Sequence, residues 1–336
     1  MLLSFIVPFF NSAKKSKRLL TTLLSIIQDD IEIILVDDGS TDNTHKLLLD
    51  FKKNANTKSV EVIKQENKGP GGARNAGLRV AKGKYVWFVD SDDDIKVEAI
   101  DVVRQNFEKE YDFIDFNIIS PIEGSNSMGI DVGEYSKSRN YSVLLLKNFG
   151  RIWSKAIRRK FLIDNDIYYP EYCLYEDNPL AFIYPFFVKS FLKSDVVGYS
   201  HHIEFESVTR SKPSLRTLDR LHTAVYGLKE GLRLAKSQAE IEILEKKFIE
   251  KYLLITTEQF STKRPSKDWI VTWRMMKQYR IVAKGLDIKS SPFETMKEST
   301  YNRKMRSYFA AQWVASFLIV KDQTDYFNTI HKKAWN

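Results

Sequence analysis

The sequence predicts a doubly wound α/β domain with a mostly parallel sheet, followed by a helical C-terminal region. Strand and helix patterns alternate over the first 120 residues, as in proteins built from βαβ units. The predicted strands are continuous apolar runs, which indicates a parallel sheet covered by helices on both faces. After about residue 210 the pattern is helical with no strong strand, so we expect a domain boundary there.

The elements of the first 120 residues follow from their local patterns. The first predicted helix carries its leucines on one face at helical spacing. The second opens with Ser, Thr and Asp, which are favoured at helix N-termini. The predicted strands are residues 2–10, 31–39, 60–65, 84–90 and 111–119, and the predicted helices are residues 14–28, 40–53, 72–83 and 95–109.

Less regular structure is expected between residue 120 and the boundary. The Gly- and Ser-rich stretch at residues 120–140 predicts a loop or a short hairpin. Helical segments are expected at residues 141–146 and 153–163, and another strand at residues 191–202. The region after the boundary, residues 211–336, is expected to be helical.

Length and composition indicate a globular protein of about two domains. The chain has 336 residues, of which 43% are apolar. Its one cysteine, Cys173, excludes an intrachain disulfide and fits a reducing compartment, so we expect a cytoplasmic protein. The apolar N-terminus lacks a basic region and a cleavage site, and it predicts a strand, not a signal peptide. The apolar run at residues 308–320 is shorter than the roughly 18 residues of a membrane span, and it predicts a buried helix.

Positive charge is concentrated in the C-terminal third of the chain. The net charge is +9, and residues 211–336 hold 24 Lys and Arg against 13 Asp and Glu. This asymmetry favours an anionic partner, such as a membrane surface, a lipid phosphate or an acidic glycan, although a solvated surface is the simpler alternative. No zinc-finger, RRM or helix-turn-helix signature is present, so no nucleic-acid partner is expected.

Acidic residues follow two of the predicted strands. The second strand ends in two adjacent acids, and the fourth ends at Asp90, the first of four acids within five positions. Because the carboxyl ends of parallel strands meet at one edge of a sheet, we expect these carboxylates in one crevice. Asp90 and Asp92 flank the small residue Ser91, so both can face one hard cation such as Mg²⁺ or Mn²⁺. Asp93 and Asp94 are expected to turn the chain and cap the next helix.

A glycine-rich segment follows the third strand at the same predicted edge. Gly69, Gly71 and Gly72 allow the backbone to approach a ligand closely. Arg74 is expected to open the helix after this loop, with a fork of donors that suits phosphate or ribose. The segment is not a Walker A loop, and no G-x-G-x-x-G follows the first strand, so a dinucleotide cofactor is disfavoured.

Five ordered motifs resemble those of family 2 nucleotide-sugar glycosyltransferases, of the bacterial polysaccharide or glycoconjugate type, which have a GT-A fold. The motifs are IVPFFN at residues 6–11, VDDGSTDNT at 36–44, NKGPGGARNAG at 67–77, FVDSDD at 88–93 and YEDNPLAF at 175–182. The stretch at residues 150–171 is similar to the W-x-K segment that often precedes the last motif. The resemblance covers about residues 3–210.

The resemblance implies a donor-binding site at the strand ends. Phe10 stands where the family uses a tyrosine against the nucleotide base, and Asp38 matches the acid that accepts a hydrogen bond from the base. The alternative for Phe10 is a core position of the first strand. The donor-binding residues implied in this way are Pro8, Phe10, Asp38, Gly69, Arg74, Asp90 and Ser91.

The resemblance also implies a divalent cation, Mn²⁺ or Mg²⁺. Asp92 matches the direct metal ligand and Asp90 an acid near the ribose or the metal. His202 is a candidate for a further metal contact, although a histidine at a strand end is more often a structural hydrogen bonder. The cation would neutralise charge on the leaving nucleoside diphosphate.

In the family, the aspartate of the last motif is the general base, which implies this role for Asp177. A carboxylate is ionised at neutral pH and can accept the proton of an attacking hydroxyl. Glu176 is expected to orient the site and contact the acceptor, and Trp153 to form part of the acceptor floor. The alternatives are that the two acids cap the helix that follows and that Trp153 is a core residue.

These implications lead to a metal-dependent inverting glycosyltransferase. It would move a sugar, expected from a UDP donor, to a hydroxyl of a growing glycan and form a β-linkage. Residues 1–210 would be the catalytic domain, with a nucleotide-binding half at 1–120 and an acceptor and base half at 121–210. The basic region at 211–336 would contact the acceptor, the inner face of the cell membrane or a second copy of the chain. The acceptor is expected to be a lipid-linked or protein-linked glycan.

Two other functions are compatible with parts of the sequence. A sugar nucleotidyltransferase shares a similar α/β core, but residues 8–18 contain no glycine where that class has a glycine-containing loop. A non-catalytic binder of an anionic partner could be built on the basic C-terminal region.

Overall fold

The computed structural model describes residues 1–121, 124–136, 139–202, 219–255 and 269–297, together with residues 309, 310, 313, 314 and 316. The chain divides into two compact units. The first contains Met1–Tyr172 and Phe187–Ser207, and the second contains Cys173–Phe186 and the chain from Val208 onwards. The motif at residues 175–182 therefore lies in the second unit. The boundary predicted near residue 210 lies outside the described residues.

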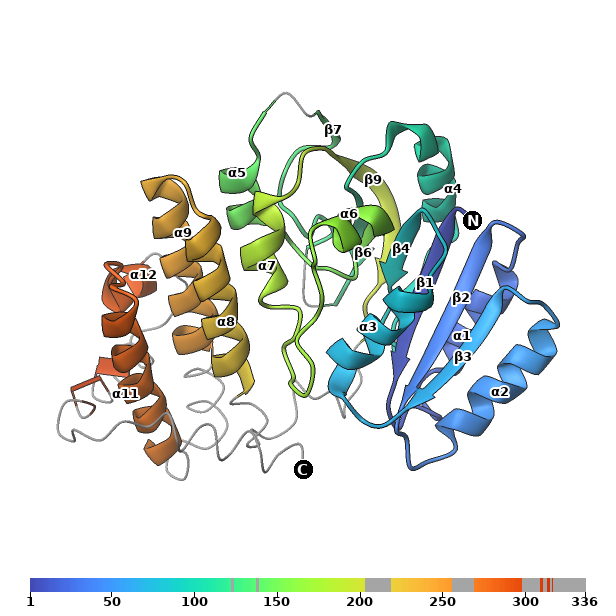
Figure 1. Cartoon of the computed structure of the whole chain (residues 1–336), viewed down its shortest axis with the longest axis horizontal. Coiled ribbons are helices and arrows are strands. Elements are labelled where there is room, and N and C mark those ends of the chain that lie inside the picture. Colours follow the sequence, from blue (N-terminus) through green and yellow to red (C-terminus); the bar gives the residue numbers. More distant parts are fainter. Residues whose placement is uncertain are drawn as a thin grey trace. The chain divides into compact units, whose positions relative to one another are not determined.

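One mixed sheet organises the first unit (Figure 1). Its strands are β1 (Leu3–Phe9), β2 (Ile31–Asp38), β3 (Val60–Gln65), β4 (Tyr85–Phe88), β5 (Asp94–Ile95), β6 (Phe113–Ile119), β7 (Gly133–Tyr135), β8 (Lys155–Arg158) and β9 (Phe191–Ser200). They lie in the order β3-β2-β1-β4-β8-β6-β9-β5, with β7 beside β9. Strands β3, β2, β1 and β4 are parallel neighbours, and β6 is parallel to β9. The predicted mostly parallel α/β sheet is confirmed.

Helices connect and cover these strands. In the first unit they are α1 (Lys17–Ser25), α2 (Thr44–Ala55), α3 (Gly69–Val80), α4 (Glu98–Gln105), the 3₁₀ turn η1 (Phe107–Lys109), α5 (Ser142–Asn148) and α6 (Arg159–Asp164). In the second unit they are α7 (Leu180–Ile183), η2 (Tyr184–Phe186), α8 (Asp219–Leu234), α9 (Gln238–Phe248), the π-helical η4 (Ile249–Leu254), α11 (Trp269–Gly285) and α12 (Pro292–Lys297). The described part of the C-terminal region is helical, as predicted.

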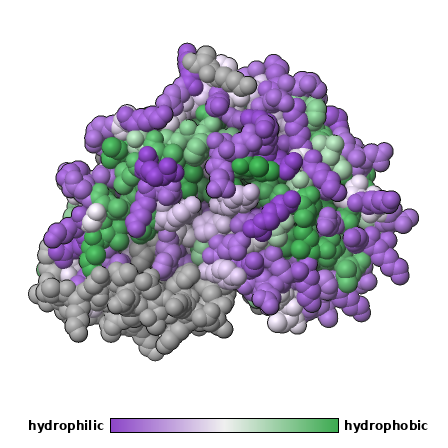
Figure 2. Space-filling view, in the orientation of Figure 1, coloured by the Kyte–Doolittle hydropathy of each residue, from purple (hydrophilic) through white to green (hydrophobic). Residues whose placement is uncertain are grey.

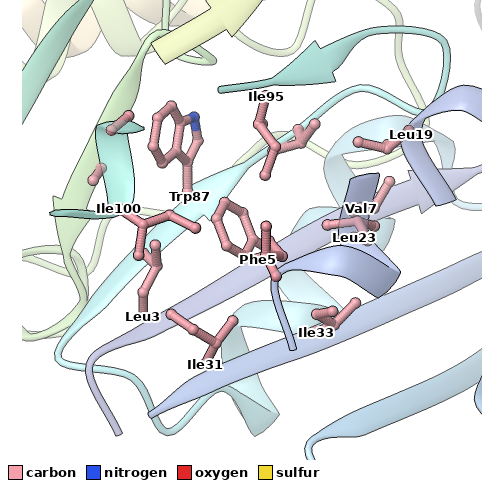
Figure 3. Packing of buried hydrophobic residues seen from close by; sticks show 14 of the residues in the cluster. Leu3, Phe5, Val7, Leu19, Leu23, Ile31, Ile33, Trp87, Ile95 and Ile100 are labelled. Atoms are coloured by element: carbon pink, nitrogen blue, oxygen red, sulfur yellow. The ribbon is translucent and has the colours of Figure 1, made fainter. Parts of the chain in front are cut away.

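Burial on both faces explains why the strands are continuous apolar runs. Successive side chains of a strand point to opposite faces of the sheet. Phe5 of β1 packs with Leu23 of α1 and Trp87 of β4 on one face (Figure 3). Ile6, the next residue, faces α3, where an ideal Cβ on Gly77 would lie 2.4 Å from its Cγ2. Helices therefore cover both faces of the sheet around β1.

The predicted helix at residues 153–163 is wrong in its first half. Strand β8 forms there and pairs antiparallel with β4 and β6, and α6 begins only at Arg159. Strand β8 has only four residues, which are too few for the spacing of apolar side chains to distinguish a strand from a helix. The two neighbouring strands decide the outcome, because each supplies hydrogen-bond partners for the backbone groups of β8.

Strand β8 also inserts a buried lysine into the sheet. Lys155 Nζ lies 2.7 Å from Asp115 Oδ1 of β6, and Lys193 Nζ of β9 lies 3.3 Å from Asp115 Oδ2. All three side chains have no solvent exposure. Burial lowers the pKa of Lys155, an effect that the neighbouring Asp115 opposes. A fully buried charge of this kind is tolerated only when it is paired.

One face of the protein is mainly polar among its described residues (Figure 2). Hydrophilic side chains cover most of the face shown in Figure 2, and apolar residues form smaller patches between them. No helix among the described residues combines the length and the apolar character that crossing a membrane requires. The helix predicted at residues 308–320 lies mostly outside these residues.

Candidate functional site

The carboxyl ends of four parallel strands meet at one edge of the sheet. Residue pairing aligns Phe9 of β1 with Asp37 of β2, and Asp38 of β2 with Gln65 of β3. Strand β4 pairs with β1 in the same direction. Parallel strands that start and stop together bring the segments that follow them into one region. The predicted convergence of the strand ends in the first unit is therefore observed.

The end of β1 places an aromatic ring on the surface. Pro8 lies in the strand, and Phe10, the second residue after it, is 42% exposed. The core alternative for Phe10 is therefore wrong. The next residue, Asn11, adopts a left-handed φ of 48°, and its Oδ1 accepts hydrogen bonds from the N–H groups of Thr41 (2.8 Å) and Asp42 (3.3 Å). Asn11 thus fastens the end of β1 to the turn after β2, a role not predicted from the sequence.

Asp38 is a buried carboxylate held by the neighbouring strand end. It is 2% exposed, and its Oδ1 accepts hydrogen bonds from Gln65 Nε2 (2.7 Å) and the N–H of Lys68 (2.9 Å). Burial raises the pKa of Asp38, and these hydrogen bonds oppose the rise. Asp37, the preceding acid, accepts a hydrogen bond from the N–H of Ser40 at 3.0 Å and stabilises the turn.

The glycine segment is helical, which corrects the prediction of a loop. Helix α3 begins at Gly69, whose φ is +79°, so the glycines form its first turn and Arg74 lies in the second. An ideal Cβ on Gly71 would lie 2.0 Å from the carbonyl oxygen of Pro170. The missing side chain of Gly71 thus makes room for the protein's own chain, and not for a ligand as expected. No sequence pattern links Gly71 to a residue so distant in the chain.

Arg74 connects the glycine helix to the acids after β4. Its Nη2 donates a hydrogen bond to Asp90 Oδ1 at 2.6 Å, and its guanidinium lies 5.3 Å from the centre of the Tyr169 ring. The Arg74 side chain is 6% exposed, whereas that of Asp90 is 32% exposed. A buried arginine in this position sets the orientation of a carboxylate at the surface of the site.

The residues after Asp90 contact the first helix and its N-terminal turn. Ser91 is buried, and its Oγ lies 3.1 Å from that of Ser12. Asp92 is 25% exposed, and its Oδ2 lies 3.5 Å from Lys15 Nζ. The carbonyl oxygen of Asp92 accepts a hydrogen bond from Arg18 Nη2 at 2.8 Å. The two basic residues hold this turn, and neither contact was predicted.

Asp93 does not cap a helix, contrary to expectation. It is buried, and it accepts hydrogen bonds from Tyr199 Oη (2.7 Å) and from the N–H of His202 (2.8 Å). Tyr199 Oη in turn accepts a hydrogen bond from the N–H of Asp90 at 3.1 Å. Burial raises the pKa of Asp93 to about 8, and the charge of Asp90 adds to this effect. The following segment forms β5, and α4 begins only at Glu98.

Trp153 and His202 are near this network. The Trp153 ring stacks on the Tyr199 ring with 4.5 Å between centroids. The backbone carbonyl oxygen of Trp153 accepts a hydrogen bond from Trp87 Nε1. Trp153 is partly buried against the core, so its acceptor role stays a prediction. His202 contacts Asp93 through its backbone. Its metal role also stays a prediction.

The acids after β4 fit a divalent cation whose coordination shell is completed by substrate phosphates. Among the described residues, no three His, Cys, Asp or Glu side chains form a group able to hold a metal ion. Mg²⁺ and similar hard ions are commonly bound by one or two carboxylates together with substrate phosphates. Asp90 and Asp92 supply that number of carboxylates, on either side of the small residue Ser91.

The predicted base lies in the second unit, in the turn before α7. Glu176 is buried, and Asp177 is half-buried. The carbonyl oxygen of Asp177 accepts a hydrogen bond from the N–H of Leu180 at 3.1 Å. The N-cap position of α7 is held by Pro179, so the expectation that Glu176 and Asp177 cap this helix is wrong.

Sequence comparisons identify a matching family and several similar proteins. Residues 4–166 match the model of the family described as Glycosyl transferase family 2. Glycosyltransferase GlyG of Streptococcus pneumoniae is 42% identical over 34% of this chain and 38% of its own length. Poly(ribitol-phosphate) β-N-acetylglucosaminyltransferase TarS of Staphylococcus aureus is 31% identical over 51% of this chain and 30% of its own length. The chain thus spans about a third of the length of these curated relatives.

Solved structures show the same fold. The crystal structure of S. aureus TarS 1-349 in complex with UDP-GlcNAc matches with a TM-score of 0.68 and 22% identity, and the match covers 99% of this chain and 91% of that one. A mannosyltransferase of Pyrobaculum calidifontis, solved in complex with GDP-Man and Mn²⁺, matches with a TM-score of 0.51 and 14% identity over 94% and 87% of the two chains. The predicted GT-A fold is confirmed.

Proposed function

We propose that this chain, whose residues 4–166 match the model of glycosyl transferase family 2, transfers a sugar from a nucleotide-sugar donor to a hydroxyl group of a glycan. One observation carries the proposal. The exposed ring of Phe10, the buried carboxylate of Asp38 and the Arg74–Asp90 pair meet at one sheet edge. An aromatic face, an acceptor for an imide N–H and oriented acids are the groups that a nucleoside diphosphate requires.

The donor in this proposal is a UDP-sugar. Phe10 stacks on the uracil ring, and Asp38 accepts a hydrogen bond from its imide N–H. The structural relative TarS was crystallised with UDP and with UDP-GlcNAc, which supports this choice of nucleotide. Gln65 and Lys68 hold Asp38 through their hydrogen bonds, so its orientation is fixed before the base arrives.

The proposed reaction also uses a divalent cation, Mg²⁺ or Mn²⁺. Asp90 and Asp92 would hold it, and the cation would offset the charge on the leaving diphosphate. The complex of the P. calidifontis mannosyltransferase with Mn²⁺ supports the choice of ion. Arg74 keeps Asp90 in a fixed orientation, and Lys15 and Arg18 hold the turn that carries Asp92.

Asp177 is the general base in this proposal. Its carboxylate accepts the proton of the acceptor hydroxyl as that oxygen attacks the anomeric carbon, on the face opposite the leaving diphosphate. The configuration inverts, and an α-linked donor gives a β-linkage. General-base assistance of this kind contributes about 10²–10⁴-fold to a rate. The acceptor class proposed is a lipid-linked or protein-linked glycan.

Two substitutions test the metal and base assignments. We expect Asp92→Ala to abolish Mn²⁺-dependent binding of UDP-sugars in calorimetry, because it removes a metal ligand. We expect Asp177→Asn to lower kcat by about 10²–10⁴-fold with unchanged donor affinity. UDP release, with and without acceptor glycan, gives kcat. Full activity of a folded Asp177→Asn variant would remove the base assignment.

Matched controls separate these effects from a general loss of charge. Asp101→Asn on α4 and Glu242→Gln on α9 change exposed acids in the first and second unit, and both should retain wild-type rates. The same preparation can be assayed with UTP and a sugar phosphate. Release of pyrophosphate would favour the nucleotidyltransferase alternative instead.

A further inference from the structure

The segment that carries the proposed base has an unusual backbone. Tyr175, directly before Glu176, has a φ of +62°. A bulky residue in the left-handed region is an outlier that costs free energy, so the surrounding contacts must hold it. Residues 173–179 form no helix or strand. A turn hydrogen bond from the N–H of Asn178 to the carbonyl oxygen of Tyr175 (3.1 Å) holds one end of this segment, and two side chains of α8 make further contacts with it.

The first of these contacts is made by Asp219, at the start of α8. Its Oδ2 accepts a hydrogen bond from the N–H of Leu174 at 3.0 Å. Asp219 is 1% exposed, and a carboxylate so buried is stable only when hydrogen bonds satisfy it. The acid therefore fixes the backbone three residues before Asp177.

The second contact is made by the next residue of the same helix. The Arg220 guanidinium lies 4.1 Å from the centre of the Tyr175 ring, and Arg220 is 6% exposed. A cation over an aromatic face is attracted by the negative face of the ring, and more strongly when it is shielded from water. This contact holds the residue with the left-handed φ, next to Glu176.

Electrostatics and packing show that α8 accompanies the whole segment. Burial raises the pKa of the Cys173 thiol, and the nearby carboxylates of Glu176, Asp219 and Asp177 raise it further. Two turns along α8, an ideal Cβ on Gly227 would lie only 2.9 Å from the Cα of Pro179. The base segment is thus held at both ends by one helix.

We propose that Asp219 and Arg220 are positioning residues for the base Asp177. They hold the backbone of Leu174 and the ring of Tyr175, and thereby fix the direction in which the Asp177 carboxylate points. The proposal rests on the base role proposed above. It assigns part of the catalytic machinery to the C-terminal helical unit, outside the residues that carry the family motifs.

A double-mutant cycle on the full chain tests this proposal. We expect Asp219→Ala to lower kcat by about 10- to 100-fold, because a small misplacement of a catalytic group has a cost of this order. Donor affinity, measured by calorimetry with UDP and Mn²⁺, should not change. In the Asp177→Asn background the same substitution should change kcat less than about twofold, because there is no base left to misplace.

Conservative and matched variants accompany the cycle. Asp219→Asn retains an oxygen that can accept the hydrogen bond, so most of the activity should return. Arg220→Lys keeps the charge but loses the planar group, and should fall between wild type and Arg220→Ala. Arg233→Ala, at the exposed far end of α8, should leave kcat unchanged.

The possible outcomes distinguish this proposal from the one on which it depends. If Asp219→Ala lowers kcat by the same factor in both backgrounds, its role is structural and the proposal is overturned. Wild-type kcat in Asp219→Ala, with Asp177→Asn impaired, also overturns it and leaves the base assignment intact. Full activity in Asp177→Asn overturns the base assignment itself. Should Asp219→Ala fail to fold, the cycle is made with Arg220→Lys, which is subject to the same criteria.

Discussion

Asp38 combines burial with a proposed role in ligand recognition. The residue is almost inaccessible to solvent, yet the proposed function requires an ionised carboxylate that faces the base. Hydrogen bonds from Gln65 and Lys68 compensate for part of the lost hydration. The raised pKa of Asp38 shows that burial outweighs these bonds. The free protein is therefore less stable with Asp38 ionised than with Asp38 protonated.

This conclusion predicts how stability depends on pH. Because the pKa of Asp38 is higher in the folded state than in the unfolded state, its contribution is fully present below the unfolded value of 3.8 and is lost as the pH rises through the folded pKa. We expect Asp38→Asn to reduce the fall in unfolding free energy over this range. Urea unfolding at a series of pH values measures it. The exposed Asp101→Asn is the control, and an unchanged slope in Asp38→Asn would contradict the prediction.

At the scale of elements, helix α3 is placed by contacts with a distant part of the chain. Asn75 exchanges hydrogen bonds with the backbone of Tyr169, and the N–H of Tyr172 donates to the carbonyl oxygen of Lys68. Gly71 allows this approach because it has no side chain. The helix that carries Arg74 is therefore held by contacts with residues 169–172 of the same unit.

We expect Gly71→Ala to disturb this contact. A methyl group there would lie 2.0 Å from the carbonyl oxygen of Pro170, so one of the two backbones must move. Overpacking of this kind typically costs about 1–3 kcal/mol, which denaturant unfolding would detect. Gly124→Ala, where an added Cβ meets nothing within 4 Å, should change stability by less than about 0.5 kcal/mol. Equal stability of the two variants would contradict the expected clash.

A buried group of three charged residues spans three strands of the sheet. Asp115 of β6 is the ion-pair partner of both Lys155 and Lys193. We expect Asp115→Ala to destabilise the protein by about 3–5 kcal/mol, because it leaves buried ammonium groups without their anion. Denaturant unfolding measures the loss. Asp195→Ala changes an exposed acid of β9 and should be nearly neutral. A similar, small effect of both variants on the free energy of unfolding would show that Asp115 and its two lysine partners contribute little to stability.

At the scale of the whole molecule, the sequence predicts the features that depend on neighbours in the chain. The acids after β2 and β4 could be placed together, because parallel strands end at a common edge. Strand β8 could not be predicted, since its partners β4 and β6 are distant in sequence. The predicted cap at Asp93 is wrong for the same reason, because the hydroxyl that donates a hydrogen bond to Asp93 belongs to the distant residue Tyr199. The base motif could be recognised, but nothing near it in sequence indicates α8.

The division of the chain into units limits how modular this protein can be. The path leaves the first unit after Tyr172, returns to it at Phe187 and leaves again before Val208. A hybrid protein joined near residue 210 would retain every family motif. It would nevertheless combine residues 173–186, which carry the proposed base, with C-terminal helices from another protein. A chimera of two relatives should therefore exchange residues 173–186 and the C-terminal helices together, because they belong to one compact unit.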